Sequence, residues 1–284
     1  MSINHLNIGL LQSDCLALPK AAAQSAQLIY GDAPRQDISS FCVAVKPASL
    51  LRRFIKPIVE FESNFRIPFK PLPASQSYAL LEWGLNWCLA TGHFNHLLLH
   101  AAVLVKDGQA VLFPAMPGSG KSTLTAWLGL NGWSVYSDEM AVIDLHTGTV
   151  QPMYRPICLK NQSIDLIQKW SPDAVLTPVC HDTAKGSVAH LKAHNWQEFS
   201  TFSPARIVGV VFPKYDVLAT EPQLYSVDKL QTFESFYTNA FNYHVLGQAS
   251  FDILTRVVNQ IKGFEVHYAA LDFMSDFLTD ELLS

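Results

Sequence analysis

Charged residues are scarce in this chain of 284 residues. Asp, Glu, Lys and Arg make up 15% of it, whereas about 25% is usual in soluble domains. The 20 basic residues are outnumbered by 24 acidic residues, which leaves a formal net charge of −4. A protein that binds nucleic acid by neutralising phosphates needs a basic surface, so this balance argues against a nucleic-acid partner.

Long apolar runs are missing as well. No run approaches the roughly 18 residues that a helix needs to cross a bilayer, so we expect no membrane span. The first residues, Met-Ser-Ile-Asn-His, lack the basic stretch followed by an apolar one that a secretory signal has. We therefore expect a cytoplasmic protein.

Cysteine is sparse and scattered. The five cysteines form no C-x-x-C pair, so the sequence indicates neither a disulfide framework nor a zinc site. We interpret them as buried, reduced thiols. They are Cys15, Cys42, Cys88, Cys158 and Cys180.

Apolar residue types, in contrast, are plentiful. They make up 49% of the chain, which is enough for a sizeable core. Together with so few charges, this leaves little polar surface to cover a monomer. The composition therefore favours a subunit interface and a homo-oligomer.

The first part of the chain consists of short apolar runs broken by proline. Residue spacing predicts a helix over residues 20–30 and strands over 41–45, 58–61 and 65–69. The proline-rich stretch 67–73 is the best candidate for a boundary. We therefore expect an N-terminal α+β region, residues 1–74, with a docking or interface role, and a second domain over residues 75–284.

The second domain alternates between strand-like and helical patterns. Asp107-Gly108 separates two apolar runs and is a strong signal for a hairpin. The alternation predicts an α/β core with a mixed sheet and inserted hairpins. The expected elements are helices over 75–91, 122–130 and 250–262 and strands over 97–106, 109–114, 134–144, 150–159, 206–212 and 264–271.

The most informative stretch matches the phosphate-binding pattern G-x-x-x-x-G-K-[ST], except that Ala115 replaces the first glycine. Gly118 and Gly120 let backbone N–H groups turn inward and form a nest for an anion. Lys121 supplies a charge for the β- and γ-phosphates, and the Ser122 hydroxyl is a ligand for Mg²⁺. We expect nucleotide binding by Pro117, Gly118, Ser119, Gly120, Lys121, Ser122 and Thr123.

An acidic pair follows the next expected strand. Asp138 and Glu139 come shortly after the helix that the glycine-rich loop opens. Ligands of α/β proteins sit at the C-terminal ends of strands, where one carboxylate can hold Mg²⁺ while the other accepts a proton. Two other interpretations are a solvated acidic turn and an ATPase acidic motif, although Ser134 and Ser137 interrupt the apolar run which that motif requires.

With these motifs, the chain resembles the HPr kinase/phosphorylase superfamily, and most closely the group called HPr-kinase-related kinases A. Members are bacterial P-loop kinases that phosphorylate a serine hydroxyl of a carrier protein. The resemblance covers residues 75–284 and implies a P-loop core like that of HPr kinase and PEP carboxykinase. It is carried by Leu99-His100-Ala101-Ala102, residues 115–122, Tyr136-Ser137-Asp138-Glu139, residues 154–161 and Asp182-Thr183-Ala184-Lys185-Gly186.

The resemblance implies roles for individual residues. Asp138 matches the proton-accepting base, and Glu139 stands where the family has a second Asp, a metal ligand. Which of the two takes the proton stays open. His100 matches a histidine near the transferred phosphate, and Arg155 matches the arginine of a Glu-Ile-Arg-Gly signature.

Two positions depart from that signature. Met153 replaces its glutamate and Pro156 its glycine, which puts a second metal site and a reverse, phosphorylase reaction in doubt. The same departures make the family's carrier protein an unexpected substrate.

Other polar residues carry weaker signals. His93, His96 and His100 are interpreted as loop and site histidines without a metal. Lys160 and Lys185 are open between phosphate or acceptor contact and a plain surface role.

Taken together, the sequence predicts a kinase that uses ATP and Mg²⁺. The catalytic residues are expected to be Asp138, Glu139, His100 and Arg155, and the metal ligands Ser122, Asp138 and Glu139. The acceptor is a hydroxyl group of a protein, a peptide or a small metabolite. The alternatives are a nucleotide-sensing module without catalysis and a simple NTPase.

Overall fold

The computed structural model describes residues 3–53, 55–114 and 118–283, and it shows a mixed α/β protein. The chain forms two compact units, both discontinuous in sequence. The first consists of residues 1–93 and 158–198, and the second of residues 94–157 and 199–284. The units meet along the chain after residues 93, 157 and 198, and the expected boundary after residue 74 is none of these, because the helix that follows it packs within the first unit.

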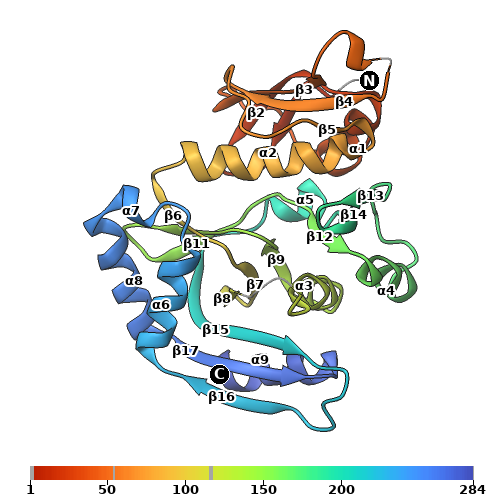
Figure 1. The fold of residues 1–284 in the computed structure, drawn as a ribbon. Helices are drawn as coiled ribbons and strands as arrows, with labels where there is room; N and C mark the ends of the chain where they lie inside the picture. Colours follow the sequence, from red (N-terminus) through yellow and green to blue (C-terminus); the bar gives the residue numbers. More distant parts are fainter. Residues whose placement is uncertain (1–2, 54, 115–117, 284) are drawn as a thin grey trace. The chain divides into compact units, whose positions relative to one another are not determined.

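The first unit contains a sheet with the strand order β1-β2-β3-β4-β5. Helices α1 and α2 pack against each other, and they contact β1, β3 and β4 (Figure 1). The elements are β1 (His5–Asn7), β2 (Gln12–Ala17), α1 (Lys20–Tyr30), β3 (Phe41–Pro47), η1 (Leu51–Arg53), β4 (Ile58–Ser63), β5 (Leu72–Pro73), η2 (Ala74–Gln76) and α2 (Ser77–Gly92).

The remainder of the first unit is supplied by a later part of the chain. A small sheet has the strand order β12-β14-β13. Its elements and their neighbours are β12 (Ile157–Lys160), α4 (Gln162–Trp170), β13 (Cys180–Thr183), β14 (Gly186–Leu191) and α5 (Trp196–Phe199). Gln76 of η2 donates hydrogen bonds to the carbonyls of His181 and Asp182, which ties this sheet to the earlier part of the chain.

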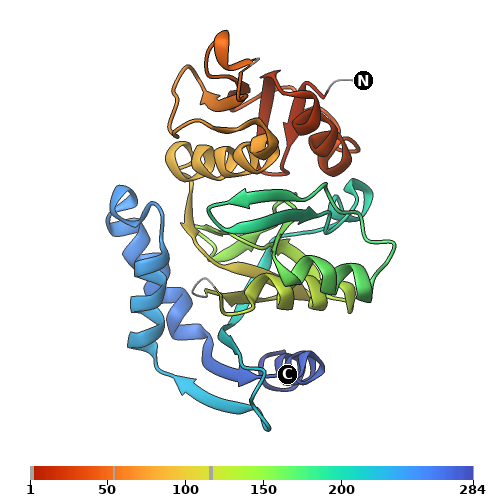
Figure 2. The same ribbon diagram turned by 45° about the vertical axis from the view of Figure 1, so that its right-hand side comes forward.

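The second unit is built on a sheet with the order β6-β10-β11-β15-β8-β7-β9, to which β17 and β16 are added beside β15. In Figure 2 the blue helices α6 and α8 of this unit lie side by side. The elements are β6 (His96–Leu99), β7 (Ala102–Lys106), β8 (Gln109–Phe113), α3 (Lys121–Leu130), β9 (Ser134–Ser137), β10 (Ala141–Asp144), β11 (Thr149–Gln151), β15 (Ala205–Tyr215), β16 (Gln223–Val227), α6 (Lys229–Asn239), α7 (Tyr243–Leu246), α8 (Gln248–Gln260), β17 (Lys262–Tyr268) and α9 (Leu271–Leu282).

The core of the second unit lies between its sheet and α8. The apolar stripe Ile253, Leu254, Val257 and Val258 of α8 is buried against β6, β7, β8 and β10, as its helical spacing indicates. Transfer of this apolar surface out of water is the main favourable term in holding the layers together.

Several sequence predictions are corrected by these elements. Residues 65–69 form no strand: the chain turns at Asn64 and Phe65, both of which have positive φ. The runs 97–106 and 134–144 each divide into two strands, because the chain leaves one neighbour in the sheet and joins another, and the run 150–159 divides between β11 of this sheet and β12 of the small sheet. The helix α8 ends at Gln260, two residues before the expected end, because Lys262 already belongs to β17.

One close contact in the first unit is testable through stability. A Cβ atom at Gly84 of α2 would lie 2.2 Å from the ring of Phe61 on β4, which is fully buried. The substitution Gly84→Ala is therefore expected to lower the free energy of unfolding by about 1–3 kcal/mol. Urea unfolding measures this change, and the exposed Thr91→Ala in the same helix serves as control, with an effect within about 0.5 kcal/mol. Equal stability of the Gly84→Ala variant and the parent would contradict the tight contact.

Candidate functional site

Three strands of the second unit bring the predicted site residues to one edge of the sheet. β7 lies between β8 and β9 and is antiparallel to both. Val103 of β7 is opposite Leu112 of β8 and Ser137 of β9. The C-terminal ends of β8 and β9 therefore lie at the same edge, two strand spacings or about 10 Å apart.

The glycine-rich segment, residues 114–120, leaves the end of β8 and leads into α3. Gly118 has φ 90° and Gly120 φ 84°, a conformation that L side chains rarely adopt. Gly120 is the N-cap of α3. Residues 115–117, which include the predicted Pro117, lie outside the described part of the chain. The described glycines thus have the backbone that the sequence pattern requires.

The first turn of α3 presents three predicted residues. Lys121, Ser122 and Thr123 are all partly exposed, and the first turn carries no acidic side chain. The N–H groups at the start of a helix have no partner within the helix, and its dipole is positive there. This end of α3 therefore favours an anion electrostatically.

The carboxylate of Asp138, at the end of β9, contacts the first turn of α3 directly. The Ser122 hydroxyl donates a hydrogen bond of 2.9 Å to Oδ2 of Asp138, whose exposed fraction is 2%. Ser137 shapes the turn, because its Oγ accepts hydrogen bonds from the backbone N–H groups of Glu139 and Met140. Glu139, the next residue, is partly exposed. The structure thus brings Ser122 and Asp138 together, with Glu139 adjacent.

His100 lies at the same edge of the sheet. It precedes β7 by two residues, and the first residue of β7, Ala102, is opposite Phe113, the last residue of β8. Its backbone N–H donates to the carbonyl of Asn239, and its ring packs against Phe241 with centroids 5.9 Å apart. The apolar run predicted His100 within a strand, whereas it lies between β6 and β7. It is at the edge of the sheet where β8 ends and the glycine-rich segment begins.

Arg155 is connected to the site through the neighbouring backbone. The N–H of Met153 donates to the carbonyl of Tyr136 in β9, and the N–H of Arg155 donates to the carbonyl of Met153. This segment therefore runs beside Tyr136, which lies near the end of β9 and two residues before Asp138. Arg155 is partly exposed, whereas Met153, which replaces the glutamate of the family signature, is buried.

The oxygen atoms at this edge fit Mg²⁺ better than a soft metal. A serine hydroxyl and a carboxylate oxygen 2.9 Å apart are hard donors, and Mg²⁺ commonly takes one or two such ligands together with water and substrate phosphates. Within the described ranges no group of three or more His, Cys, Asp or Glu side chains is placed to hold a metal. His96, one of the three histidines that we interpreted as binding no metal, faces Asp144, with Nε2 3.9 Å from Oδ2.

Sequence reasoning missed the residues that support the glycine-rich segment from β15 and β17. The N–H of Tyr215 donates to the carbonyl of Ser119 at 3.2 Å. Its ring and that of Tyr268 lie with centroids 5.9 Å apart. Burial raises the pKa of the Tyr268 hydroxyl well above its usual range. No local signal could have found this contact, because it joins residues far apart in the sequence.

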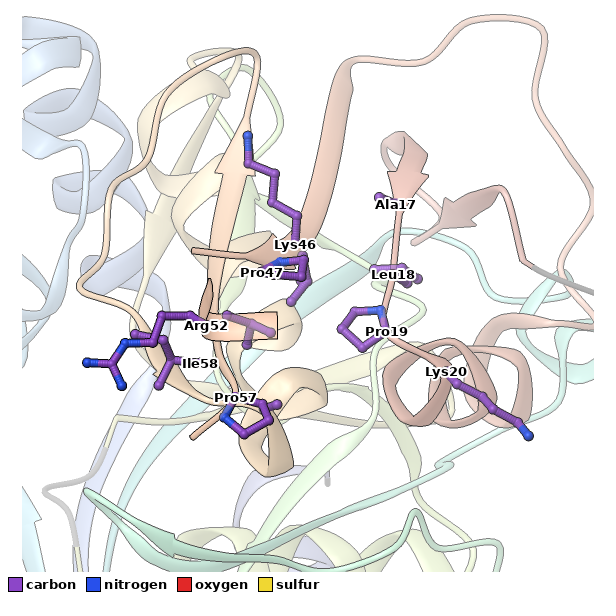
Figure 3. Close-up of a pocket in the computed structure, with 12 residues that line it drawn as sticks. Ala17, Leu18, Pro19, Lys20, Lys46, Pro47, Arg52, Pro57 and Ile58 are labelled. Atoms are coloured by element: carbon purple, nitrogen blue, oxygen red, sulfur yellow. The ribbon is translucent and has the colours of Figure 1, made fainter. Parts of the chain in front are cut away.

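The first unit holds a cavity of about 480 Å³ beside the ends of β2 and β3. Its walls are mostly apolar, including Pro19, Pro47 and Ile58, and in Figure 3 the charged ends of Lys20 and Arg52 point away from it. None of the predicted site residues lines it.

Lys185 and Lys160 also belong to the first unit. The Lys185 ammonium lies 5.6 Å from the centroid of the Trp83 ring, a cation–π distance. Lys185, in the turn between β13 and β14, thus has a packing role within the first unit.

In the part of the chain that the structure describes, no helix is long and apolar enough to cross a bilayer. Cys88, Cys158 and Cys180 are buried, as we expected. Cys15 and Cys42, which we expected to be buried, are partly exposed instead.

From the Glu265 carboxylate, near the end of β15, we expect the stability of the fold to depend on pH. Glu265 on β17 accepts from Lys214 Nζ at 2.8 Å and from His267 Nε2 at 2.7 Å. The hydrogen bond from Lys214, and then that from His267, lower the pKa of Glu265 below its usual 4.5. A lowered carboxylate pKa stabilises the fold above pH 4.5, and this contribution is lost as the pH falls through the lowered value.

The variant Glu265→Gln is therefore expected to unfold more easily at pH 7, by less than about 1 kcal/mol because the pair is partly exposed. The difference from the parent chain should shrink in acid, below the pKa of Glu265. Urea titrations at a series of pH values check this, and a difference that grows towards acid pH would contradict it.

Comparison with known proteins adds no relative, because no family model and no curated protein matches the chain. The kinship that the sequence suggests therefore stays a prediction. The function proposed below follows from the residues at the sheet edge.

Proposed function

We propose that the protein is an ATP- and Mg²⁺-dependent kinase that transfers the γ-phosphate to a Ser/Thr-type hydroxyl group of a protein, a peptide or a small molecule. One observation carries the proposal: the Ser122 hydroxyl, in the first turn after the glycine-rich segment, is hydrogen-bonded to the buried carboxylate of Asp138 at the end of β9. A hydroxyl and a carboxylate joined in this way are the parts that hold a nucleotide-bound Mg²⁺ in P-loop enzymes.

Nucleotide binding would use the glycine-rich segment as a phosphate-binding loop. Inward-facing backbone N–H groups and the N-terminus of α3 would receive the β-phosphate, and Lys121 would bridge the β- and γ-phosphates. The positive φ of Gly118 and Gly120 supports this, because such a backbone forms an anion nest.

Metal binding would use Ser122 and Asp138, with Glu139 next to them. Bound Mg²⁺ would neutralise charge on the phosphates and orient the γ-phosphate for attack. The Ser122 hydroxyl donates a hydrogen bond to Asp138 Oδ2 at 2.9 Å, so the two oxygens are close enough together to become ligands of one ion.

Transfer requires a base that takes the proton of the acceptor hydroxyl. Asp138 and Glu139 are the candidates, and they differ in exposure: Asp138 is buried, whereas Glu139 is partly exposed. Asp138 is proposed as the base, acting through the carboxylate oxygen that does not face Ser122, and Glu139 as a further ligand on the metal side. His100, just before β7, and Arg155, beside β9, would stabilise the charge of the transferred group.

The kinship proposed on sequence grounds is consistent with this chemistry. HPr-kinase-like enzymes act on a serine hydroxyl, and residues 1–74 would then serve to dock the acceptor or a second copy of the chain. The buried Met153 offers no carboxylate where the family signature has one, so one metal site and forward transfer are proposed, without the reverse reaction.

The central test is phosphate transfer from ATP to candidate proteins and metabolites, followed as a mass increase. The wild-type chain with Mg²⁺ should label an acceptor, and Lys121→Ala should abolish labelling. Asp138→Asn should reduce the rate by about 10²–10⁴-fold, the usual contribution of a general base. Lys106→Ala serves as the matched lysine control, because Lys106 lies at the opposite end of β7 and packs on the Trp133 ring.

The alternatives give different results in the same assay. Steady ATP hydrolysis that no acceptor changes would identify an NTPase. ATP binding without any product, unaffected by Asp138→Asn, would identify a nucleotide-sensing module and overturn the kinase. If Glu139→Gln abolishes transfer while Asp138→Asn does not, the base is Glu139.

A further inference from the structure

β15 extends past the end of β8 and borders the glycine-rich segment. Val210 of β15 is opposite Leu112 of β8, which is the residue before the end of that strand. β15 continues for five residues beyond this point, parallel to β17, and ends at Tyr215 opposite Tyr268. The last residues of β15 thus reach Ser119, near the start of α3.

The contact between the two segments is made by backbone and side chain. The N–H of Tyr215 donates to the carbonyl of Ser119 at 3.2 Å. A Cβ atom at Gly120 would lie 3.0 Å from Cβ of Tyr215 and 3.8 Å from the hydroxyl of Tyr268. The Ser119–Gly120 peptide is therefore packed against the ends of β15 and β17.

This hydrogen bond determines the direction of the next N–H group. In a trans peptide the carbonyl of one residue and the N–H of the following residue point in opposite directions. Because the Ser119 carbonyl faces Tyr215, the Gly120 N–H points away from β15. A flipped peptide would turn the carbonyl to that side and offer an anion a repulsive oxygen in place of a donor.

We propose that Tyr215 is a positioning residue: its backbone N–H holds the Ser119–Gly120 peptide so that the Gly120 N–H faces the polyphosphate of a bound nucleotide. The proposal rests on the proposed function, since it presumes that the glycine-rich segment binds phosphate. It adds that the support comes from a strand end outside the sequence motif.

The register of the strands leaves the Tyr215 N–H available for this purpose. The ladder between β15 and β17 uses the next N–H group, that of Asp216, which donates to the Tyr268 carbonyl at 2.9 Å. Neighbouring N–H groups on a strand point to opposite sides. Loss of the Tyr215 N–H therefore removes the bond to Ser119 and leaves this ladder bond in place.

The test compares variants that remove or keep this N–H group. Tyr215→Pro removes it, whereas Tyr215→Phe keeps both the N–H and the ring. The affinity for inorganic pyrophosphate, measured with Mg²⁺ by displacement of a fluorescent ATP analogue, should fall about 10-fold in Tyr215→Pro and less than about 3-fold in Tyr215→Phe. Circular dichroism and thermal unfolding establish that each variant is folded.

Kinetics separate positioning from a general loss of structure. The Gly120 N–H would bind the phosphates equally in the ground state and the transition state, so Tyr215→Pro should raise KM for ATP and leave kcat within about 2-fold. A folded Tyr215→Pro chain with unchanged pyrophosphate affinity and unchanged KM would overturn the proposal. A wild-type chain that binds neither pyrophosphate nor ATP would instead show that the proposed function itself is wrong.

The peptide can also be observed without any variant. Among the 14 glycines, only Gly120 follows a serine, and among the 9 tyrosines only Tyr215 follows a lysine. Labelling with ¹³C-carbonyl serine and ¹⁵N-glycine therefore gives one NMR signal from the Ser119–Gly120 peptide, which should shift downfield in ¹H when pyrophosphate binds. The corresponding Lys214–Tyr215 signal should show slow amide hydrogen exchange, and exchange at the rate of an open amide would refute the contact even if Tyr215→Pro does not fold.

Discussion

The arrangement of the site depends on the position of β7 between β8 and β9. Because β7 is antiparallel to both strands, β8 and β9 point the same way and end at one edge. The glycine-rich segment continues from one of them and the acidic pair from the other, and Ser122 and Asp138 meet across the gap. A swap of two strands in this order would move the carboxylate away from the first turn of α3, although every local motif remained intact.

The local elements around the site were predictable from sequence because short-range chemistry determines them. Asp107-Gly108 has positive φ at both residues and forms the predicted hairpin turn between β7 and β8. α3 begins within one residue of the predicted start, since Gly120 can take the left-handed conformation that its N-cap position requires. We expected Asp138 to follow a strand whose C-terminal end lies at the ligand-binding edge of the sheet. In the structure Asp138 follows β9 and accepts a hydrogen bond from Ser122, in the first turn of α3.

Other features follow from long-range pairing and could not be predicted. The apolar run around His100 looks like one strand, yet it divides between β6, which pairs with β10, and β7, which pairs with β8. The spacing of the sequence contains no information on where a chain changes partners. The same holds for the first unit, whose small sheet comes from residues after the glycine-rich segment, and for Tyr215, which meets that segment only through the register of β15 and β17.

The distance along the chain between Gly120 and Tyr215 has a consequence for biosynthesis. As the chain leaves the ribosome, β8, α3 and β9 are complete long before β15 and β17 exist, and domains fold as units when their last strands arrive. The first unit is completed only after residue 198, because its small sheet is encoded there. The second unit therefore cannot reach its native strand pairing until β15 and β17 have been made, and until then the edge of β8 that pairs with β15 needs shielding from other chains.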